Sequence, residues 1–185
     1  YTTLSAEVLA SLGIMVSASD PTITLHTANG EREASIVLLD RVWLGDLAID
    51  GLAIATCEEC ASSDTVGLLG LNVASGFNLT IDADRREVVF NTRKTNDRKL
   101  DVKQFSDLDA SFTRFPGGRI EVEASLRNDS NRTILAAQAS IHCGANTWTL
   151  DLENIEAGQV GHARRRLPEH TGCDSYEIAL EKAIW

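Results

Sequence analysis

Val66-Gly67-Leu68-Leu69-Gly70-Leu71-Asn72-Val73 is the stretch that restricts the fold more than any other part of the sequence. Two large aliphatic residues precede Gly70, and a turn of small residues comes before them. A glycine within a strand pattern indicates that another backbone approaches closely, because a side chain would block that approach. The pattern therefore predicts a buried strand packed hard against another backbone. A less specific interpretation is an ordinary core strand that ends in a turn.

Short β-type segments surround this stretch. One helix is predicted from Leu4 to Leu12, where apolar residues follow helical spacing, Ser5 suits the helix start and Gly13 suits its end. Strands are expected at Thr22–Thr27, Ala34–Leu39, Arg41–Leu44, Leu47–Thr56, Asn78–Ala83 and Glu87–Thr92. The first part of the chain is thus predicted to be a mainly β domain with one short helix.

A second domain is predicted after a linker. Residues 93–99 contain no apolar residue, so we expect them to separate a domain at 1–92 from one at 100–185. Strands in the second domain are expected at Ala110–Phe115, Arg119–Leu126, Ile134–Cys143, Thr147–Leu152, Gln159–Arg164 and Ser175–Ile184. Their spacing is typical of a small β-sandwich.

The charge balance bears on partners. The chain has 27 Asp and Glu residues against 17 Lys and Arg, a formal net charge of −10, which argues against a nucleic-acid partner. The short basic cluster Arg164-Arg165-Arg166 is interpreted as a solvated edge. The sequence has neither a signal peptide nor the roughly 20 consecutive apolar residues of a membrane helix. The residues from Tyr1 onward look like the middle of a secondary-structure element, so a membrane anchor before Tyr1 stays an open alternative.

The four cysteines predict disulfides rather than a metal site. A structural zinc site needs four ligands in two tight pairs, and only Cys57 and Cys60 are close in sequence. We expect a disulfide between Cys143 and Cys173, which fits an oxidising, extracytoplasmic compartment. For Cys57 and Cys60 a disulfide and free thiols stay equally open. No metal and no organic cofactor is predicted.

Other catalytic patterns are weak. No Ser-His-Asp arrangement stands out, and Ser75 lacks the preceding glycine of a nucleophile elbow. The paired acids Glu58-Glu59 and Asp82/Asp84 are interpreted as solvated loop residues. The residues alone therefore identify no catalytic group.

Several motifs in the first half nevertheless stand in a telling order. They are Tyr1–Ile14, Thr27-Ala28-Asn29-Gly30, Val42–Ile49, Leu68–Ala74, and the hairpin of Leu79–Asp82 with Glu87–Phe90. This order resembles the retropepsin-like aspartic peptidases, in particular the bacterial membrane-associated or periplasmic group. The resemblance covers residues 1 to about 92 and implies half of an acid-protease β-barrel. More faintly, residues 100–185 resemble the immunoglobulin-like β-domains of bacterial envelope proteins.

The resemblance implies peptide hydrolysis by two aspartates, one from each subunit of a homodimer. The family's Asp-Thr-Gly would fall just before Tyr1, so no catalytic residue is expected in this chain. Asp64-Thr65-Val66-Gly67 is not a substitute, because Val66 separates threonine from glycine. Thr27, Ala28, Asn29 and Gly30 are expected to form the substrate-binding flap. Leu68, Leu69 and Gly70 are expected to support the strand of the catalytic loop.

Two interpretations follow for the function. In the first, the encoded protein is an aspartic endopeptidase, a hydrolase that acts on a peptide or protein substrate in the periplasm or another extracytoplasmic compartment. The alternative is a non-catalytic envelope protein that binds a partner through a degenerate peptidase fold and a β-sandwich. The residues encoded before Tyr1 discriminate between the two.

Overall fold

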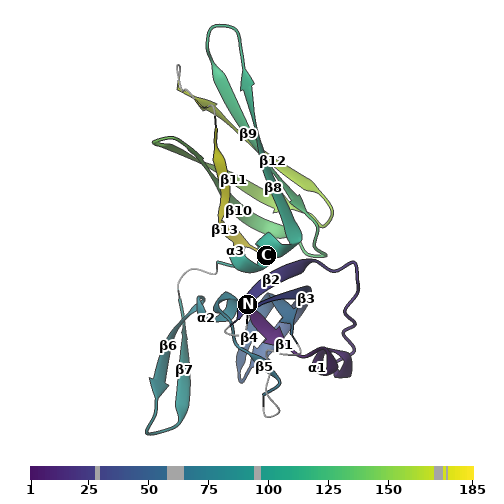
Figure 1. The fold of residues 1–185 in the computed structure, drawn as a ribbon. Coiled ribbons are helices and arrows are strands. Elements are labelled where there is room, and N and C mark those ends of the chain that lie inside the picture. Colours follow the sequence, from purple (N-terminus) through teal and green to yellow (C-terminus); the bar gives the residue numbers. More distant parts are fainter. Residues whose placement is uncertain (28–29, 58–64, 94–96, 169–172, 174) are drawn as a thin grey trace. The chain divides into compact units, whose positions relative to one another are not determined.

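The computed structural model describes residues 1–27, 30–57, 65–93, 97–168, 173 and 175–185. The chain divides into two compact units, Tyr1–Asn96 and Asp97–Trp185. Both are mainly β, as the sequence predicts (Figure 1). Within the described residues, no helix has the length and apolar character needed to cross a membrane.

The first unit is built on a five-stranded sheet with the order β2-β3-β4-β1-β5. Its strands are β1 (Thr2–Leu4), β2 (Thr22–Thr27), β3 (Gly30–Leu44), β4 (Leu47–Thr56) and β5 (Gly67–Leu68). Neighbours pair antiparallel, except that β1 runs parallel to β4. The chain's first strand therefore lies inside the sheet, between strands that come about fifty and sixty-five residues later.

Two short helices cover this sheet. Helix α1 (Ala6–Ser11) begins at Ser5, whose hydroxyl oxygen accepts a hydrogen bond from the Val8 amide at 3.3 Å; this is a typical N-cap. Helix α2 (Leu71–Ala74) follows β5 directly. Buried side chains of both helices, of β3 and β4, and of the strand after α2 form one apolar core: Leu9, Val37, Ile49, Leu52, Ile54, Val73 and Phe77.

The prediction of two strands at Ala34–Leu39 and Arg41–Leu44 is wrong. Both belong to β3, a single strand of 15 residues that continues through Asp40. Because Asp40 is exposed, its charge stays in water and does not interrupt the strand. An exposed polar residue such as Asp40 therefore does not end a half-buried strand.

A two-stranded hairpin completes the first unit. It consists of β6 (Phe77–Asp82) and β7 (Glu87–Thr92), which pair antiparallel from Phe77↔Thr92 to Asp82↔Glu87. These strands match the predicted segments to within one residue. The hairpin forms a sheet of its own, separate from the five-stranded sheet (Figure 1).

The second unit has two three-stranded sheets, ordered β12-β9-β8 and β11-β10-β13. The strands are β8 (Ser106–Arg114), β9 (Ile120–Asn128), β10 (Ile134–Cys143), β11 (Asn146–Ile155), β12 (Val160–Leu167) and β13 (Glu177–Ile184). Apolar residues alternate strictly along β9, where Ile120, Val122, Ala124 and Leu126 are all buried. This period of two places one face of each sheet in a common core.

Several predicted boundaries of the second unit need correction. The strands predicted to end at Leu152 and Arg164 each continue for three more residues, to Ile155 in β11 and Leu167 in β12. Residues 97–99 were assigned to the linker, but Lys99 begins the short helix α3 (Lys99–Val102), which leads through a 3-10 turn (η1, Lys103–Phe105) into β8. Arg98 is buried beside Asp101, with Nε and Oδ2 at 3.4 Å. The strand predicted at Ala110 starts four residues earlier, at Ser106. The linker was predicted from polarity alone, and this prediction is wrong for residues 97–99 because an ion pair allows an arginine to be buried.

The predicted disulfide between Cys143 and Cys173 is present, with Cα atoms 5.6 Å apart. Cys143 is the last residue of β10, and Cys173 precedes β13. Cys57 is disulfide-bonded as well, while Cys60 lies outside the described residues. Disulfides of this kind are typical of oxidising compartments.

Replacing both Cys143 and Cys173 by serine is expected to destabilise the second unit. The bond closes a loop of 30 residues, and the chain-entropy relation gives about 3–4 kcal/mol for a loop of that size. Urea unfolding of the oxidised protein and of the double variant, followed by circular dichroism, measures the difference. A loss below about 1 kcal/mol would contradict the expectation.

A charged cluster lies on the sheet β12-β9-β8. Glu123 accepts a hydrogen bond from Arg164 Nε at 2.7 Å, and His162 Nδ1 lies 2.9 Å from its other oxygen. The Arg164 hydrogen bond is the main cause that holds the pKa of Glu123 below its usual value, opposed by partial burial. A carboxyl whose pKa is lowered on folding contributes stability above its unfolded pKa and loses it as the pH falls through the folded pKa.

The variant Arg164→Gln is therefore expected to raise the pKa of Glu123 toward the ordinary glutamate value. The variant should also lose less stability than the wild type between neutral pH and pH 3. NMR titration of the side-chain carboxyl carbons measures the pKa directly. Arg127→Gln serves as the matched control, because Arg127 pairs with Asp107 and Asp129 instead of Glu123. An unchanged Glu123 titration in Arg164→Gln would contradict this assignment.

Candidate functional site

The candidate site surrounds β1, at the start of the chain. Thr2 and Thr3 are buried, at 7% and 4% exposure, although both are polar. Thr2 lies opposite Ile54 of β4, and Thr3 lies opposite Leu68 of β5. β1 is therefore held on both edges, and its polar side chains need partners within the unit.

Asn72 is the main partner of Thr2. The Asn72 side-chain oxygen accepts hydrogen bonds from the Thr2 amide at 2.8 Å and from the Thr2 hydroxyl at 2.9 Å. Its amide nitrogen donates to the Ala53 carbonyl at 2.8 Å. Asn72 is only 3% exposed, so these bonds lie in a water-poor environment where geometry is tightly fixed. One side chain thus ties β1 to β4 and to helix α2.

Glycines allow the β5 segment to lie directly against β1. A Cβ atom at Gly70 would lie 2.1 Å from the Tyr1 carbonyl carbon, and one at Gly67 would lie 2.0 Å from the backbone carbonyl oxygen of Thr3. The Gly70 amide donates to the Thr2 hydroxyl at 3.0 Å, and the Leu68 amide to the Thr3 hydroxyl at 3.2 Å. The close backbone approach that the sequence predicts at Gly70 is therefore present.

The two leucines beside Gly70 are not buried, contrary to the prediction for this stretch. Leu68 is 52% exposed and Leu69 is 47% exposed. Strand β5 is only two residues long, so the backbone at Gly67 and Gly70 makes the close contact while the leucine side chains lie at the surface. A short strand at the edge of a sheet has a neighbour on one side only, so its side chains can be exposed to solvent. The run of aliphatic residues in the sequence does not show this.

An apolar cavity of about 200 Å³ adjoins β1 and β5. Residues of β1, β3, β4 and helix α2 and the segment from Val66 to Leu69 line it. Its apolar lining side chains are Leu4, Val42, Leu44, Leu52, Ile54, Val66, Leu68, Leu69 and Val73. A cavity with this lining suits an aliphatic side chain, and it offers no charged group for chemistry.

The predicted flap coincides with the hairpin of β2 and β3. Thr27 and Gly30 form the last backbone pair of this hairpin, and Gly30 has a φ of 108°, a conformation that favours glycine. Ala28 and Asn29 lie outside the described residues. The hairpin is thus present where the sequence predicts it, and its role as a flap stays a prediction.

The acidic candidates stay apart from this site. Asp82 is half-buried, and its carboxylate accepts a hydrogen bond from the Arg85 amide at 3.0 Å within the β6–β7 turn. Asp84 is exposed in the same turn. Glu58, Glu59 and Asp64 lie outside the described residues. No group of three or more His, Cys, Asp and Glu side chains suited to a metal occurs in the part of the chain that the structure describes.

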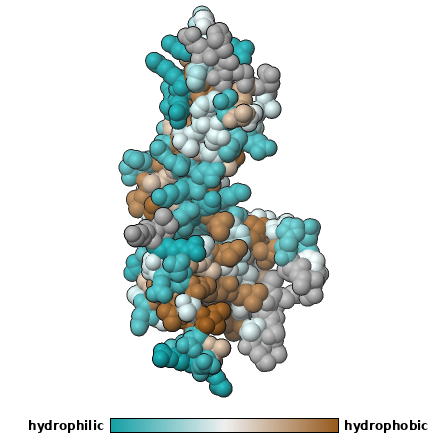
Figure 2. Space-filling view, turned by 90° about the vertical axis from the view of Figure 1, so that its left-hand side faces the viewer, coloured by the Kyte–Doolittle hydropathy of each residue, from teal (hydrophilic) through white to brown (hydrophobic). Residues whose placement is uncertain are grey.

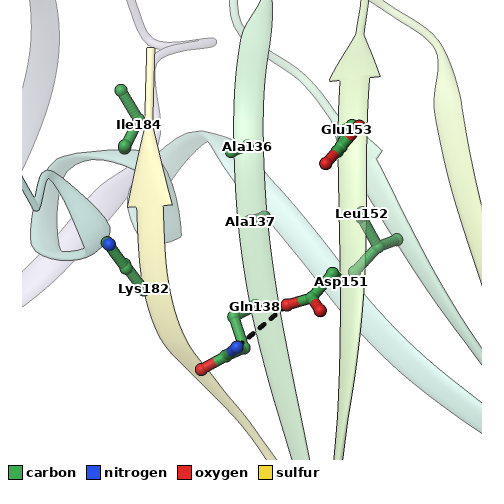
Figure 3. A pocket seen from close by; sticks show the side chains of 8 residues that line it. All are labelled: Ala136, Ala137, Gln138, Asp151, Leu152, Glu153, Lys182 and Ile184. Atoms are coloured by element: carbon green, nitrogen blue, oxygen red, sulfur yellow. Dashed lines mark hydrogen bonds between the residues drawn. The ribbon is translucent and has the colours of Figure 1, made fainter.

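A second hollow, of about 170 Å³, lies on the outer face of the sheet β11-β10-β13 (Figure 3). Ala136 forms its floor, and Asp151, Glu153 and Lys182 stand along its sides. Gln138 donates a hydrogen bond to Asp151 at 2.9 Å. The hollow is smaller and carries no activated nucleophile, so the region around β1 remains the stronger candidate.

Sequence reasoning gave no role to Thr2 and Asn72. The signal that could have found Asn72 is its position: it is a single polar residue between Leu71 and Val73, in the first turn of a short helix. A polar side chain between apolar neighbours must either be exposed or find buried partners. Its partners Thr2 and Ala53 lie 70 and 19 residues away along the chain, which no local pattern shows.

Comparison with known proteins adds one result. The sequence model of the family described as "Aspartyl protease" matches residues 1–73. Neither a curated protein nor a solved structure matches the chain. The matched residues run from the start of β1 to Val73 in helix α2, and they include Thr2, Gly70 and Asn72. Residues 1–73 are thus similar to aspartyl proteases, and residues 74–185 lie outside the match.

Proposed function

We propose that the encoded protein is an aspartic endopeptidase whose catalytic aspartate lies on the segment just before Tyr1. The observation that carries this proposal is the support around β1, where Asn72 and Gly70 fix the backbone of Tyr1 and Thr2. The similarity of residues 1–73 to aspartyl proteases supports it. A catalytic group must be held within about 0.5 Å of its productive position, and a braced strand provides such support.

The reaction follows from the chemistry of a carboxyl pair. Two carboxyl groups that are a few ångströms apart share one proton, because both cannot ionise easily. The ionised group removes a proton from a water molecule as that water attacks the peptide carbonyl carbon. The protonated group donates its proton to the carbonyl oxygen. The carboxyl that took the water proton then gives it to the amide nitrogen, and the carbon–nitrogen bond of the tetrahedral intermediate breaks. The other carboxylate takes a proton from a hydroxyl of the intermediate as the new carboxyl group forms, so the pair again holds one proton.

One chain of this kind supplies one aspartate. The proposed enzyme is therefore a homodimer with its active site on the two-fold axis. The hairpin of β2 and β3 would close over the bound peptide with the tip formed by Thr27, Ala28, Asn29 and Gly30, and would exclude water. Leu68 and Leu69 would contact apolar side chains of the substrate beside the cavity, while Gly70 holds β1 in place.

The disulfide-bonded cysteines Cys57, Cys143 and Cys173 support a periplasmic or other extracytoplasmic location. In this proposal the second unit would bind or position a protein substrate. No cofactor is needed, because the carboxyl pair and water supply all the reacting groups.

The test uses the protein with all the residues encoded before Tyr1. The aspartate of an Asp-Thr-Gly or Asp-Ser-Gly triplet in that segment is replaced by asparagine, and cleavage of an unbiased peptide mixture is measured by mass spectrometry between pH 3 and 8. Cleavage should fall at least 10³-fold, while circular dichroism stays unchanged. Absence of the triplet, or cleavage that persists in Asp→Asn, would overturn the enzyme and favour the non-catalytic binding protein.

A further inference from the structure

The outer face of the sheet β11-β10-β13 carries carboxylates along both of its outer strands. On the middle strand β10, whose side chains alternate between the two faces, the outward residues are Ala136, Gln138, Ser140 and His142. Cross-strand pairing places four acids on the same face: Asp151 and Glu153 on β11, and Glu177 and Glu181 on β13. Lys182 is the only lysine or arginine in these three strands, so the face has an excess of three negative charges.

The two carboxylates of β11 have no basic partner. The Asp151 carboxylate accepts a hydrogen bond from the uncharged side chain of Gln138 at 2.9 Å. The Glu153 side chain has neither a hydrogen bond nor an ion pair with another described residue. Lys182 stands on the opposite side of the hollow and points away from both carboxylates (Figure 3). Two like charges on one face of a strand repel each other, and a cation placed between them would remove this repulsion.

The other sheet of the same unit pairs its acids with bases. On the sheet β12-β9-β8, Glu123 lies 2.7 Å from Arg164 and 2.9 Å from His162. Asp107 lies 3.6 Å from Arg127 on the neighbouring strand. Carboxylates on this second unit are therefore balanced by cations on one outer face and left without them on the other. The difference points to a cation that comes from another molecule.

The hollow beside Asp151 and Glu153 has the form that a long cationic side chain needs. Its volume is about 170 Å³, and Ala136 and Ile184 give it an apolar floor and side (Figure 3). The methylene groups of lysine and arginine pack on apolar surface while their charged ends stay at the polar rim. Arginine suits this site better than lysine, because its planar guanidinium has several donors and can bond two carboxylates at once.

We propose that this face binds an extended segment of a partner protein, with an arginine of that segment in the hollow between Asp151 and Glu153. Charge complementarity selects this partner. In Figure 2 hydrophilic side chains predominate on the upper part of the molecule, whereas apolar side chains gather on the lower part. Alternate side chains of an extended segment lie about 7 Å apart on one side, so a second arginine two positions away can approach the acids of β13.

This binding does not need the aspartate of the proposed function. Only the use of the face to hold a protein substrate of the peptidase rests on that proposal. The contact is expected to be weak, because an exposed ion pair changes a dissociation constant by only roughly two- to fivefold. It should weaken further as salt is raised, since salt screens exposed charges, whereas an apolar contact would not weaken.

The experiment titrates the isotope-labelled 185-residue chain with a peptide and follows the backbone amides by NMR, which detects millimolar binding. The probe is acetyl-Gly-Thr-Arg-Thr-Arg-Thr-Gly-amide. Its control is the same peptide with citrulline in place of both arginines, which keeps the shape and removes the charge. The arginine peptide should shift the amides of Gln138, Asp151 and Glu153 and bind at least about fivefold more tightly than the citrulline peptide.

Two variants test the hollow itself. Glu153→Gln keeps the shape and removes one charge, so it should raise the dissociation constant about threefold. Ala136→Leu fills the hollow and should raise it about tenfold, because the arginine stem loses its place. The matched control is Glu121→Gln, which removes the same charge from the other sheet of the unit and should change the dissociation constant less than about 1.5-fold.

Three results would overturn the proposal: equal binding of the two peptides, shifts confined to the sheet β12-β9-β8, or an unchanged dissociation constant in Glu153→Gln. The last of these keeps the test decisive if Ala136→Leu does not fold. The peptidase test uses the residues before Tyr1, and this experiment does not. A protein that cleaves no peptide but binds the arginine probe would therefore retain this face and lose only the enzyme.

Discussion

Gly70→Ala is expected to unfold the first unit or come close to it. The backbone of Gly70 has a φ of −96° and a ψ of 176°, a conformation that alanine adopts without strain. The effect is therefore purely steric: the added Cβ would lie 2.1 Å from the Tyr1 carbonyl carbon and 2.3 Å from the Thr2 nitrogen. Both obstacles are backbone atoms that cannot rotate away.

The expected loss is about 4 kcal/mol, a value reached only where a substitution breaks a specific packing arrangement. A small domain has about 5–15 kcal/mol of stability in total, so most of it would be lost. Hydrogen exchange measured by mass spectrometry follows the two units separately. Fast exchange should appear in β4 and β5, while β9 and β10 of the second unit stay protected.

Gly76→Ala is the control for this experiment. Its Cβ would meet only the Val73 carbonyl oxygen, at 3.4 Å, which is ordinary contact. The change should cost less than about 1 kcal/mol, since alanine also reduces the freedom of the unfolded chain. Equal protection in Gly70→Ala and Gly76→Ala would show that β1 does not lie against Gly70.

Asn72→Ala is expected to cost about 3 kcal/mol. The substitution leaves the Thr2 amide and the Ala53 carbonyl without the partner that Asn72 provides, in a position that water reaches poorly. Each buried polar group that loses its partner costs about 1–3 kcal/mol. Urea unfolding of the wild type and the variant measures the loss.

Asn72→Asp separates the role of the side-chain donor from that of the acceptor. Aspartate keeps an oxygen for Thr2, but its ionised form has no donor for the Ala53 carbonyl. Burial favours the protonated form, which can donate, and so raises the pKa of this carboxyl in the folded chain above its value in the unfolded chain. The variant should therefore regain stability as the pH falls toward about 4, and the gain should be complete below that pH. Asn72→Ala should regain none, and equal pH profiles for the two variants would refute the assigned hydrogen bonds.

The local elements could be read from the sequence, and the site could not. Strands such as Thr22–Thr27, Leu47–Thr56 and Ile134–Cys143 were predicted to the residue, because alternation and turn residues define them locally. Gly70 was also recognised, since an interior glycine has a local signature. Thr2 bonds both Gly70 and Asn72, which lie about 70 residues later in the chain. This pairing depends on the order of the strands in the sheet.

Exposure was the hardest property to predict. Leu68 and Leu69 have the composition of a core strand, yet they lie at the surface because β5 is short and at the edge of its sheet. Arg98 lies in a segment whose polar composition is typical of a linker, yet it is buried beside Asp101. In both cases the environment is set by a neighbouring element, and hydropathy describes only the residue itself.

The position of β1 inside its sheet has a consequence for the timing of folding. The first strand pairs with residues 54–56 and 67–68, and its bracing side chain is at position 72. During synthesis the beginning of the chain must therefore wait until more than seventy residues have left the ribosome. Contacts of such long sequence separation slow folding and leave the early segment unpaired meanwhile. In the second unit the β8–β9 and β10–β11 pairs join neighbouring segments, whereas β12 and β13 pair with β9 and β10, which lie some forty residues earlier.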